Sequence, residues 1–243
     1  MNKRYLILIC VCLIFICPLN GQKITVIERN GAFTASEKQK EFYYIEKDFP
    51  LTDDRWVAIL EGTCNNTKQS NLENLFYDFW ETANAMGANA FFINDFSVDR
   101  HSVFVTVSIF NLTKEELNDN VELYSFNKIY VFGDLIVSTF KTKIPKYRKI
   151  KVNKVKIKVY PLSYYEYQSK IGEKETITFG GVLGSGVFRS GEAGNLSLYV
   201  SLGDGKFERA LTPWGQGLSY SSGSIYPLDI NFGQFLAEIL ESY

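Results

Sequence analysis

Residues 70–93 read SNLENLFYDFWETANAMGANAFFI and decide the fold of this chain. Apolar side chains recur here at three- and four-residue steps, which places them on one face of a helix. They are Leu72, Leu75, Phe76, Phe79, Trp80, Ala83 and Met86. Burying one large apolar side chain stabilises a fold by about 1.5–3 kcal/mol, so this face predicts a core helix. A ligand pocket lined by the same face is the alternative interpretation.

Both ends of this helix carry termination signals. Ser70 and Glu73 have the spacing of a capping box, in which each side chain bonds the backbone N–H of the other residue. Gly87 stands where a residue with positive φ would end the helix. Apolar runs at residues 55–61 and 88–93 predict a strand on each side, and together they predict a right-handed βαβ crossover.

Shorter patterns surround this unit. Residues 23–29 and 42–45 predict two strands, with Asn30 and Gly31 forming a turn after the first. Residues 94–102 are polar and predict a connection, whereas residues 103–110 predict a strand covered on both faces and therefore central in its sheet. Thr113 and Glu116 form a second capping box, which opens a short helix to about Asn118.

The pattern changes after Asn118, and the polar residues 119–122 predict a domain junction. We therefore expect an α+β fold: a mixed-sheet domain at residues 23–122 and a β-rich domain at residues 123–243. The second domain is predicted to be an antiparallel sandwich or open barrel, closed by a helix from Asn231. Its expected strands are residues 128–132, 137–140, 149–152, 155–160, 164–168, 175–179 and 196–202.

The N-terminus resembles a secretory signal peptide. Lys3 and Arg4 precede thirteen mostly apolar residues and then a polar exit, so we expect residues 1–22 to be removed on export. An apolar run of this length is short of the roughly 20 residues that span a bilayer. A lipid anchor at Cys17 is the alternative, although Ile16 precedes it. The predicted location is secreted, periplasmic or cell envelope, with no transmembrane span after cleavage.

Composition limits the function classes. Three of the four cysteines lie in the leader, so the mature chain keeps Cys64 alone and has no internal disulfide. Removing Lys3 and Arg4 from the 26 basic residues leaves 24 against 27 acidic residues, a net charge near −3. This balance does not indicate nucleic acid as a partner.

The most distinctive charge pattern is KTKIPKYRKIKVNKVKIK at residues 141–158, which holds nine basic and no acidic side chains. Lysine alternates with Ile and Val, so a strand here would carry ammonium groups on one face and apolar groups on the other. The candidate binding residues are Lys149, Lys151, Lys154, Lys156 and Lys158. Their expected partner is an anionic glycan, a lipid headgroup or an acidic protein. The alternative is a solvated sheet face whose lysines discourage edge pairing.

Catalytic and metal signals are weak. His101 is the only histidine, and a Cys64–His101 pair lacks any recognisable nucleophile setting. Asp95, Asp99 and His101 have suitable metal-ligand chemistry but no fourth ligand at a telling spacing. We therefore predict no metal and no cofactor. A hydrolase with an unrecognised carboxylate pair remains the alternative to a binding module.

Residues 180–194, GGVLGSGVFRSGEAG, are rich in glycine. They lack the Gly-Lys-Ser/Thr ending of a phosphate loop and do not open a helix. We expect a loop or bulged turn between strands, which could shape a binding edge.

The segment Ala83 to Ala90, with the pattern Ala-x-x-Met-Gly-Ala-Asn-Ala, resembles a turn found in small α/β domains of bacterial envelope proteins. Some of those domains are described as metal-binding or stress-sensing modules. The resemblance covers about residues 55–110, under a quarter of the chain, and the clustered Cys or His ligands are absent here. Residues 151–202 are similar to β-rich domains of secreted bacterial proteins. The resemblance implies an uncharacterised exported bacterial family and, with the missing catalytic sets, a non-enzymatic binding or structural module.

Overall fold

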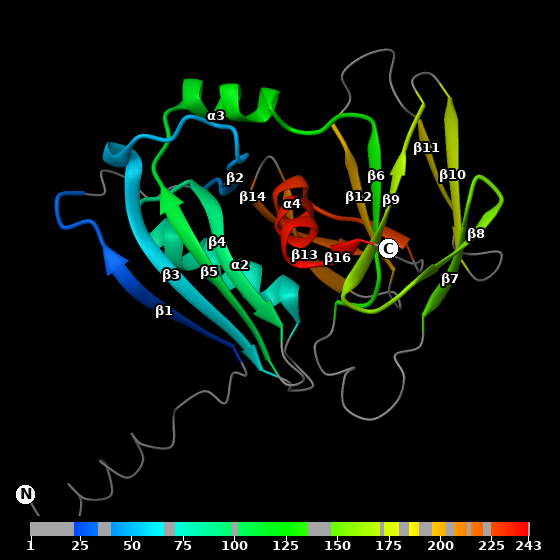
Figure 1. Ribbon diagram of the computed structural model, residues 1–243, viewed down its shortest axis with the longest axis horizontal. Helices are drawn as coiled ribbons and strands as arrows, with labels where there is room; N and C mark the ends of the chain where they lie inside the picture. The colour runs from blue at the N-terminus through cyan, green and yellow to red at the C-terminus, as the bar shows by residue number, and fades with distance from the viewer. Residues whose placement is uncertain are drawn as a thin grey trace, which may run out of the picture.

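The computed structural model describes residues 22–33, 40–65, 71–98, 102–135, 147–170, 173–179, 185–189, 196–202, 207–212, 215–220 and 225–242. The protein is mixed α+β, as expected, with helices placed among several sheets (Figure 1). The strand predicted at residues 137–140 and nearly all of the predicted signal peptide lie outside the described residues.

The first sheet has five strands in the order β1-β3-β5-β4-β2. They are β1 (Gln22–Arg29), β2 (Tyr43–Tyr44), β3 (Trp56–Asn65), β4 (Ala90–Val98) and β5 (Ser102–Phe110). Because β3 and β4 both pair antiparallel with β5, they run parallel to each other on its two sides. The predicted strand–helix–strand unit is therefore confirmed in one sheet, with β5 inserted between its strands. The central position predicted for residues 103–110 is also confirmed.

The connection predicted at residues 94–102 is wrong, because β4 continues to Val98 and pairs with β5. A register shift between Ile93 and Asp95 marks a bulge at Asn94, whose side-chain amide donates to Ser108 Oγ at 2.8 Å. Polar residues beyond the bulge are exposed, so the strand extends without burying them. This polar segment is thus part of a strand, and its polar side chains are exposed to solvent.

Helix α2 (Leu72–Ala85) packs on this sheet with its apolar face. Of the seven predicted face residues, six are buried and Met86 is partly buried, so the core interpretation is confirmed. On β3 beneath the helix, a Cβ at Gly62 would lie 2.3 Å from Phe79 Cζ, so only glycine allows this close approach. The Phe76 ring lies 5.7 Å from Phe91 of β4.

The structure contradicts the N-cap predicted for α2 and agrees with its predicted C-terminal end. The N-cap is Asn71, whose side chain accepts from Asn74 N at 2.7 Å, so the predicted cap at Ser70 is wrong by one residue. Ser70 itself lies outside the described residues. At the C-terminus Gly87 has φ 82°, and the N–H groups of Gly87 and Ala88 donate to Asn84 and Ala83 carbonyls. This glycine-terminated end is confirmed.

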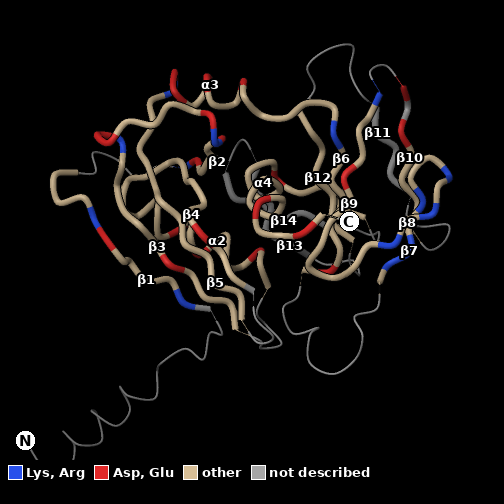
Figure 2. Tube along the Cα trace, in the orientation of Figure 1, with Lys and Arg blue, Asp and Glu red and all other residues tan. Residues whose placement is uncertain are grey.

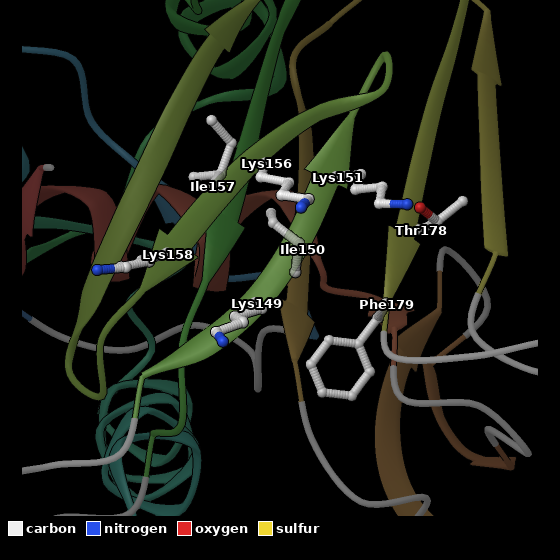
Figure 3. A pocket seen from close by; sticks show the side chains of 8 residues that line it. All are labelled: Lys149, Ile150, Lys151, Lys156, Ile157, Lys158, Thr178 and Phe179. Carbon is white, nitrogen blue, oxygen red and sulfur yellow. The ribbon is translucent and has the colours of Figure 1, made fainter.

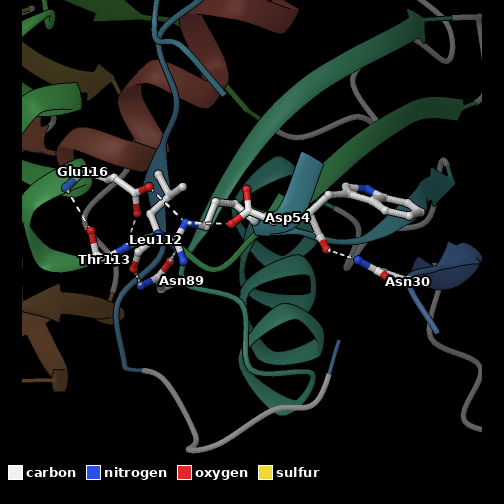
Figure 4. Close-up of polar contacts among 8 residues, drawn as sticks. Asn30, Asp54, Asn89, Leu112, Thr113 and Glu116 are labelled. Carbon is white, nitrogen blue, oxygen red and sulfur yellow. Dashed lines mark hydrogen bonds and ion pairs between the residues drawn. The ribbon is translucent and has the colours of Figure 1, made fainter. Parts of the chain in front are cut away.

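Helix α3 (Lys114–Glu122) begins with the predicted Thr113–Glu116 capping box and continues past Asn118. Residues 119–122, predicted to be a junction, form its last turn. The 3-10 turn η1 (Asp53–Arg55) contacts this helix, because Arg55 Nε lies 2.9 Å from Glu116 Oε1. The buried side chain of Asn89 forms hydrogen bonds with both the carbonyl oxygen and the N–H of Leu112, each at 2.8 Å (Figure 4).

The second sheet has the strand order β15-β12-β6-β9-β16. Its strands are β6 (Lys128–Phe132), β9 (Ser163–Gln168), β12 (Leu198–Leu202), β15 (Ile225–Pro227) and β16 (Glu241–Ser242). The β6–β12 and β9–β16 pairs are parallel, so the expectation of a purely antiparallel second half is wrong. The closing helix is confirmed as α4 (Ile230–Ile239), with Asp229 as its N-cap.

The third sheet has the order β11-β10-β7-β8. Its strands are β7 (Arg148–Val152), β8 (Val155–Val159), β10 (Lys174–Phe179) and β11 (Ser185–Arg189), and a separate hairpin joins β13 (Phe207–Thr212) to β14 (Gly215–Tyr220). β11 lies within the glycine-rich segment, where a loop or bulged turn was expected. Its pairing with β10 supplies the backbone partners of that strand.

The second sheet lies between two apolar cores. Tyr130 and Phe132 of β6 belong to the core that also holds α2 and α4, whereas Ile129 and Val131 belong to the core shared with the third sheet. Figure 1 shows the same succession of layers, from the first sheet through the helices to β7, β8, β10 and β11. The third sheet is therefore the outermost layer at its end of the molecule.

The larger core crosses the predicted domain boundary at residue 122. Phe235 of α4 lies 5.4 Å from Phe76 of α2, between ring centroids, and Phe91 of β4 is 6.2 Å away. A buried polar contact accompanies these rings: Tyr124 Oη donates to the Tyr44 carbonyl oxygen at 2.6 Å. The division at residues 122 and 123 remains a prediction, and residues on both sides share one apolar cluster.

Candidate functional site

The lysine-rich stretch forms a tight β-hairpin. β7 and β8 pair antiparallel, with Lys149 opposite Lys158 and Lys151 opposite Lys156. Asn153 and Lys154 form the two-residue turn, with φ values of 46° and 71°. Positive φ at both positions is typical of a type I′ turn, whose twist matches the flanking strands. The turn therefore fixes which side chains of the two strands share a face.

All five predicted binding lysines are exposed, and the hairpin brings four of them onto one face. The opposite face carries Ile150, Val152 and Val159, which are buried against the second sheet. Figure 2 shows the resulting concentration of basic residues on β7 and β8. Lys154 lies apart from the four, at the tip of the turn.

An aromatic ring accompanies the first lysine pair. The Nζ atoms of Lys158 and Lys149 lie 4.8 and 5.7 Å from the centre of the Tyr147 ring. Tyr160 packs on the same ring at 5.6 Å. Throughout the described part of the chain, no Asp or Glu forms an ion pair with any of the five lysines. The face therefore keeps its positive charge.

A groove of about 520 Å³ runs along this hairpin. Side chains of three strands line it: Lys149, Ile150, Lys151, Lys156, Ile157, Lys158, Thr178 and Phe179 (Figure 3). Thr178 and Phe179 belong to β10, where Thr178 is opposite Lys151. This volume is within the range of ligand sites, about 300–1,000 Å³.

The turn is held in place from below by the side chain of Asn153. Its amide nitrogen donates to Tyr167 Oη at 2.9 Å and to the buried Glu175 carboxylate, and its Oδ1 accepts from Thr176 N at 2.9 Å. These contacts join the hairpin to β9 and β10. The lysine pairs are consequently presented on a fixed backbone.

Sequence reasoning missed four residues of this site. Tyr147, Thr178 and Phe179 carried no signal, because only strand pairing brings them beside the lysines. Glu175 looked like an ordinary strand acid, although it is buried under the turn. The five lysines were found because alternation with Ile and Val is visible along a single strand.

Of the catalytic and metal candidates, the structure describes Cys64 and Asp95. Cys64 is completely buried at the end of β3, with its Sγ 3.7 Å from the Asn71 carbonyl oxygen, and is inaccessible as a nucleophile. Asp95 is exposed on β4, whereas Asp99 and His101 lie outside the described residues. Within the residues that the structure describes, no group of three or more His, Cys, Asp or Glu side chains could hold a metal ion.

Two neighbouring carboxylates, Glu46 and Glu238, serve to join β2 to α4. Glu46 accepts from Gln234 Nε2 at 3.1 Å, and Glu238 lies 2.6 Å from Lys47 Nζ. Burial, followed by the nearby Glu238 charge, raises the pKa of Glu46. Both acids are therefore occupied by contacts between elements, and neither lines the groove on the hairpin.

A second, more open groove of about 590 Å³ lies between β1 and α2. Val26 and Arg29 line one side, and Glu81, Thr82, Ala85 and Met86 line the other. Its charges are mixed, and it contains no concentration of like groups. The hairpin groove is the better candidate site.

Comparison of the chain with family models, curated proteins and solved structures finds no match. No helix among the described elements is long and apolar enough to cross a membrane. The assignment of the site therefore rests on the geometry of the β7–β8 hairpin.

Proposed function

We propose that this protein is an exported, non-enzymatic binding module of the cell envelope, and that the lysine face of the β7–β8 hairpin binds an anionic ligand. Export is inferred from the basic and apolar leader at residues 1–22. The ligand is an anionic glycan, a lipid headgroup or an acidic protein, since each presents negative charge to a basic surface.

The observation that carries this proposal is the position of the lysines in the sheet. β8 is an edge strand, so Lys156 and Lys158 could serve to prevent edge-to-edge pairing. β7 is an interior strand, paired with both β8 and β10, and protection of an edge does not account for Lys149 and Lys151. Like charges directly opposite each other destabilise a sheet. An anion between them would remove that repulsion.

The turn residue supports the same proposal. Lys154 adopts a φ of 71°, where glycine is preferred because it has no Cβ. A lysine here adds positive charge to the hairpin at a cost in backbone energy of about 1 kcal/mol. Local backbone strain of this kind is often found at functional sites.

The finer architecture belongs to the same proposal. The second and third sheets share one core, which supports a two-layer β-sandwich for much of residues 123–243. In that arrangement the hairpin lies on the outer surface, away from the α+β part at residues 23–122. A rigid sheet presenting a charged face suits binding more than chemistry.

Binding of polyanions to variants tests the proposal. We would measure the affinity of heparin, poly-glutamate and phosphatidylserine vesicles for the protein and for K149Q/K151Q/K156Q/K158Q. The matched control removes four exposed basic residues on β1, just before β2 and on α3: K23Q/R29Q/K40Q/K114Q. The two variants have equal net charge, so a difference between them reports position.

We expect at least one polyanion to bind the natural protein. The hairpin variant should lose about tenfold or more in affinity for it, equivalent to about 1.4 kcal/mol, while the control changes much less. Equal losses of affinity in both variants would show that binding depends on overall charge and not on the position of the lysines. Failure of every polyanion to bind would remove the proposed function.

A further inference from the structure

The two lysine pairs form a regular array. We define the Lys149–Lys158 pair as rung one and the Lys151–Lys156 pair as rung two. Residues directly opposite each other in antiparallel strands have Cβ atoms about 4.5–5.5 Å apart. Since two residues along a strand advance about 6.8 Å, the rungs repeat at that spacing. Each rung thus offers two ammonium groups to one anionic group, and the next rung offers the same one step further.

The hydrogen-bonding pattern brings the lysines of each rung closer together. Val152 and Val155 flank the two-residue turn and form a hydrogen-bonded pair in such hairpins. Pairs alternate from there, which places both rungs at non-hydrogen-bonded sites, where side chains approach most closely. Two ammonium groups at such a site can contact the same sulfate, phosphate or carboxylate.

Rung one is preorganised without being neutralised. Both of its ammonium groups lie near the Tyr147 ring, at 4.8 and 5.7 Å from the ring centre. A cation–π contact orients a lysine but leaves its charge available, unlike a carboxylate. Asn153 fixes the turn through Tyr167 and Glu175. Less ordering is therefore required when a ligand binds.

The groove also has an apolar part. Ile157 and Phe179, partly exposed on the other face of the strands, line it together with the four lysines, whereas Ile150 is buried. A single inorganic anion would leave that surface uncovered, and a flat bilayer would not fill a groove of about 520 Å³. A chain of sugar rings carries both carbon surface and repeated anionic groups.

We propose that the ligand is a linear anionic polysaccharide that lies along the hairpin groove and places successive anionic groups on the two rungs. This inference rests on the proposed function and narrows its ligand to one class. Contact with both rungs makes binding depend on chain length, because the second contact is intramolecular once the first has formed.

Size-defined heparin oligosaccharides test this arrangement by isothermal titration calorimetry. We expect the hexasaccharide to bind the natural protein at least about tenfold more tightly than the disaccharide. In K149Q/K158Q and in K151Q/K156Q, each lacking one rung, this length advantage should largely disappear, while disaccharide binding persists at the remaining rung. K23Q/K114Q, which removes two exposed lysines elsewhere, should keep the advantage. Circular dichroism checks that each variant is folded.

Three outcomes would overturn the inference. Equal affinity of the disaccharide and hexasaccharide would exclude contact with both rungs. Tighter binding of poly-glutamate or of phosphatidylserine vesicles than of the hexasaccharide would assign the site to an acidic protein or a membrane. Either result leaves the proposed anion-binding function in place. Absence of hairpin-dependent binding to any of these probes would remove both.

Discussion

Asn153 and Lys154 show how two residues set the geometry of a whole surface. Asn153 tolerates positive φ and uses its side chain to bond Tyr167, Glu175 and Thr176. Lys154 adopts positive φ without a side-chain hydrogen bond to any other described residue. In the proposed function, its role is to add positive charge to the hairpin.

Replacing Lys154 with glycine separates these two contributions. The K154G variant should be as stable as the natural protein or more stable, by up to about 1 kcal/mol, because glycine adopts positive φ without a Cβ clash. Its affinity for polyanions should fall, since one of five cations is lost. Urea unfolding and heparin titration provide the two measurements. A variant that gains stability and binds as before would show that Lys154 has no part in the site.

For single residues, the sequence predicts the role of a side chain when that role depends on residues nearby in the chain. Lysine alternation identified the exposed face, and Gly87 identified the helix end. The cap at Asn71 was missed because Ser70 and Glu73 offered the same capping-box chemistry one residue earlier. Tyr147 and Thr178 could not be assigned, because their position beside the lysines depends on pairing between strands.

Among the elements, α4 depends on a partly buried acid. Asp229 caps the helix by accepting from Asn231 N at 2.9 Å and Phe232 N at 3.2 Å. Burial raises the pKa of this carboxyl group above its usual value near 4, and the two backbone bonds oppose the rise only in part. The folded state therefore holds this proton more tightly than the unfolded state does.

The pH dependence follows from that difference. The contribution of Asp229 to stability is complete below its unfolded pKa and is lost as pH rises through its folded pKa. We expect D229N, which keeps the acceptor oxygen and removes the titration, to gain stability relative to the natural protein as pH rises from about 4 to about 7. Urea unfolding across that range measures it. D229A, the control, also removes the titration and should stay about 1 kcal/mol less stable than D229N at every pH, because the capping acceptor is lost. A pH-independent difference for D229N would contradict the raised pKa.

The elements themselves were predicted unevenly for a physical reason. α2, β5 and β6 have apolar patterns set by burial, and their positions were found within about two residues. The continuation of β4 beyond Ile93 and the strand β11 carry polar or glycine-rich sequences, so pairing with a neighbour decides their structure. The parallel β6–β12 and β9–β16 pairs have no local sequence signal at all.

In the whole molecule, one apolar core joins α2, α4 and two sheets, while the lysine hairpin lies on the outermost sheet. Composition gave no warning of this arrangement, because the chain is slightly acidic overall. Positive charge is concentrated where the fold brings the lysines of β7 and β8 together. A binding surface at one end, supported by a shared core, is the central claim about this protein.

Lysine protection mapped over the whole chain tests that claim most directly. The protein would be acetylated under limiting conditions with and without heparin, and the modification at each lysine measured by mass spectrometry. Bound polyanion should protect Lys149, Lys151, Lys154, Lys156 and Lys158, while Lys23, Lys40 and Lys114 remain as reactive as before. Uniform protection of all exposed lysines, or protection confined to those outside the β7–β8 hairpin, would contradict the account.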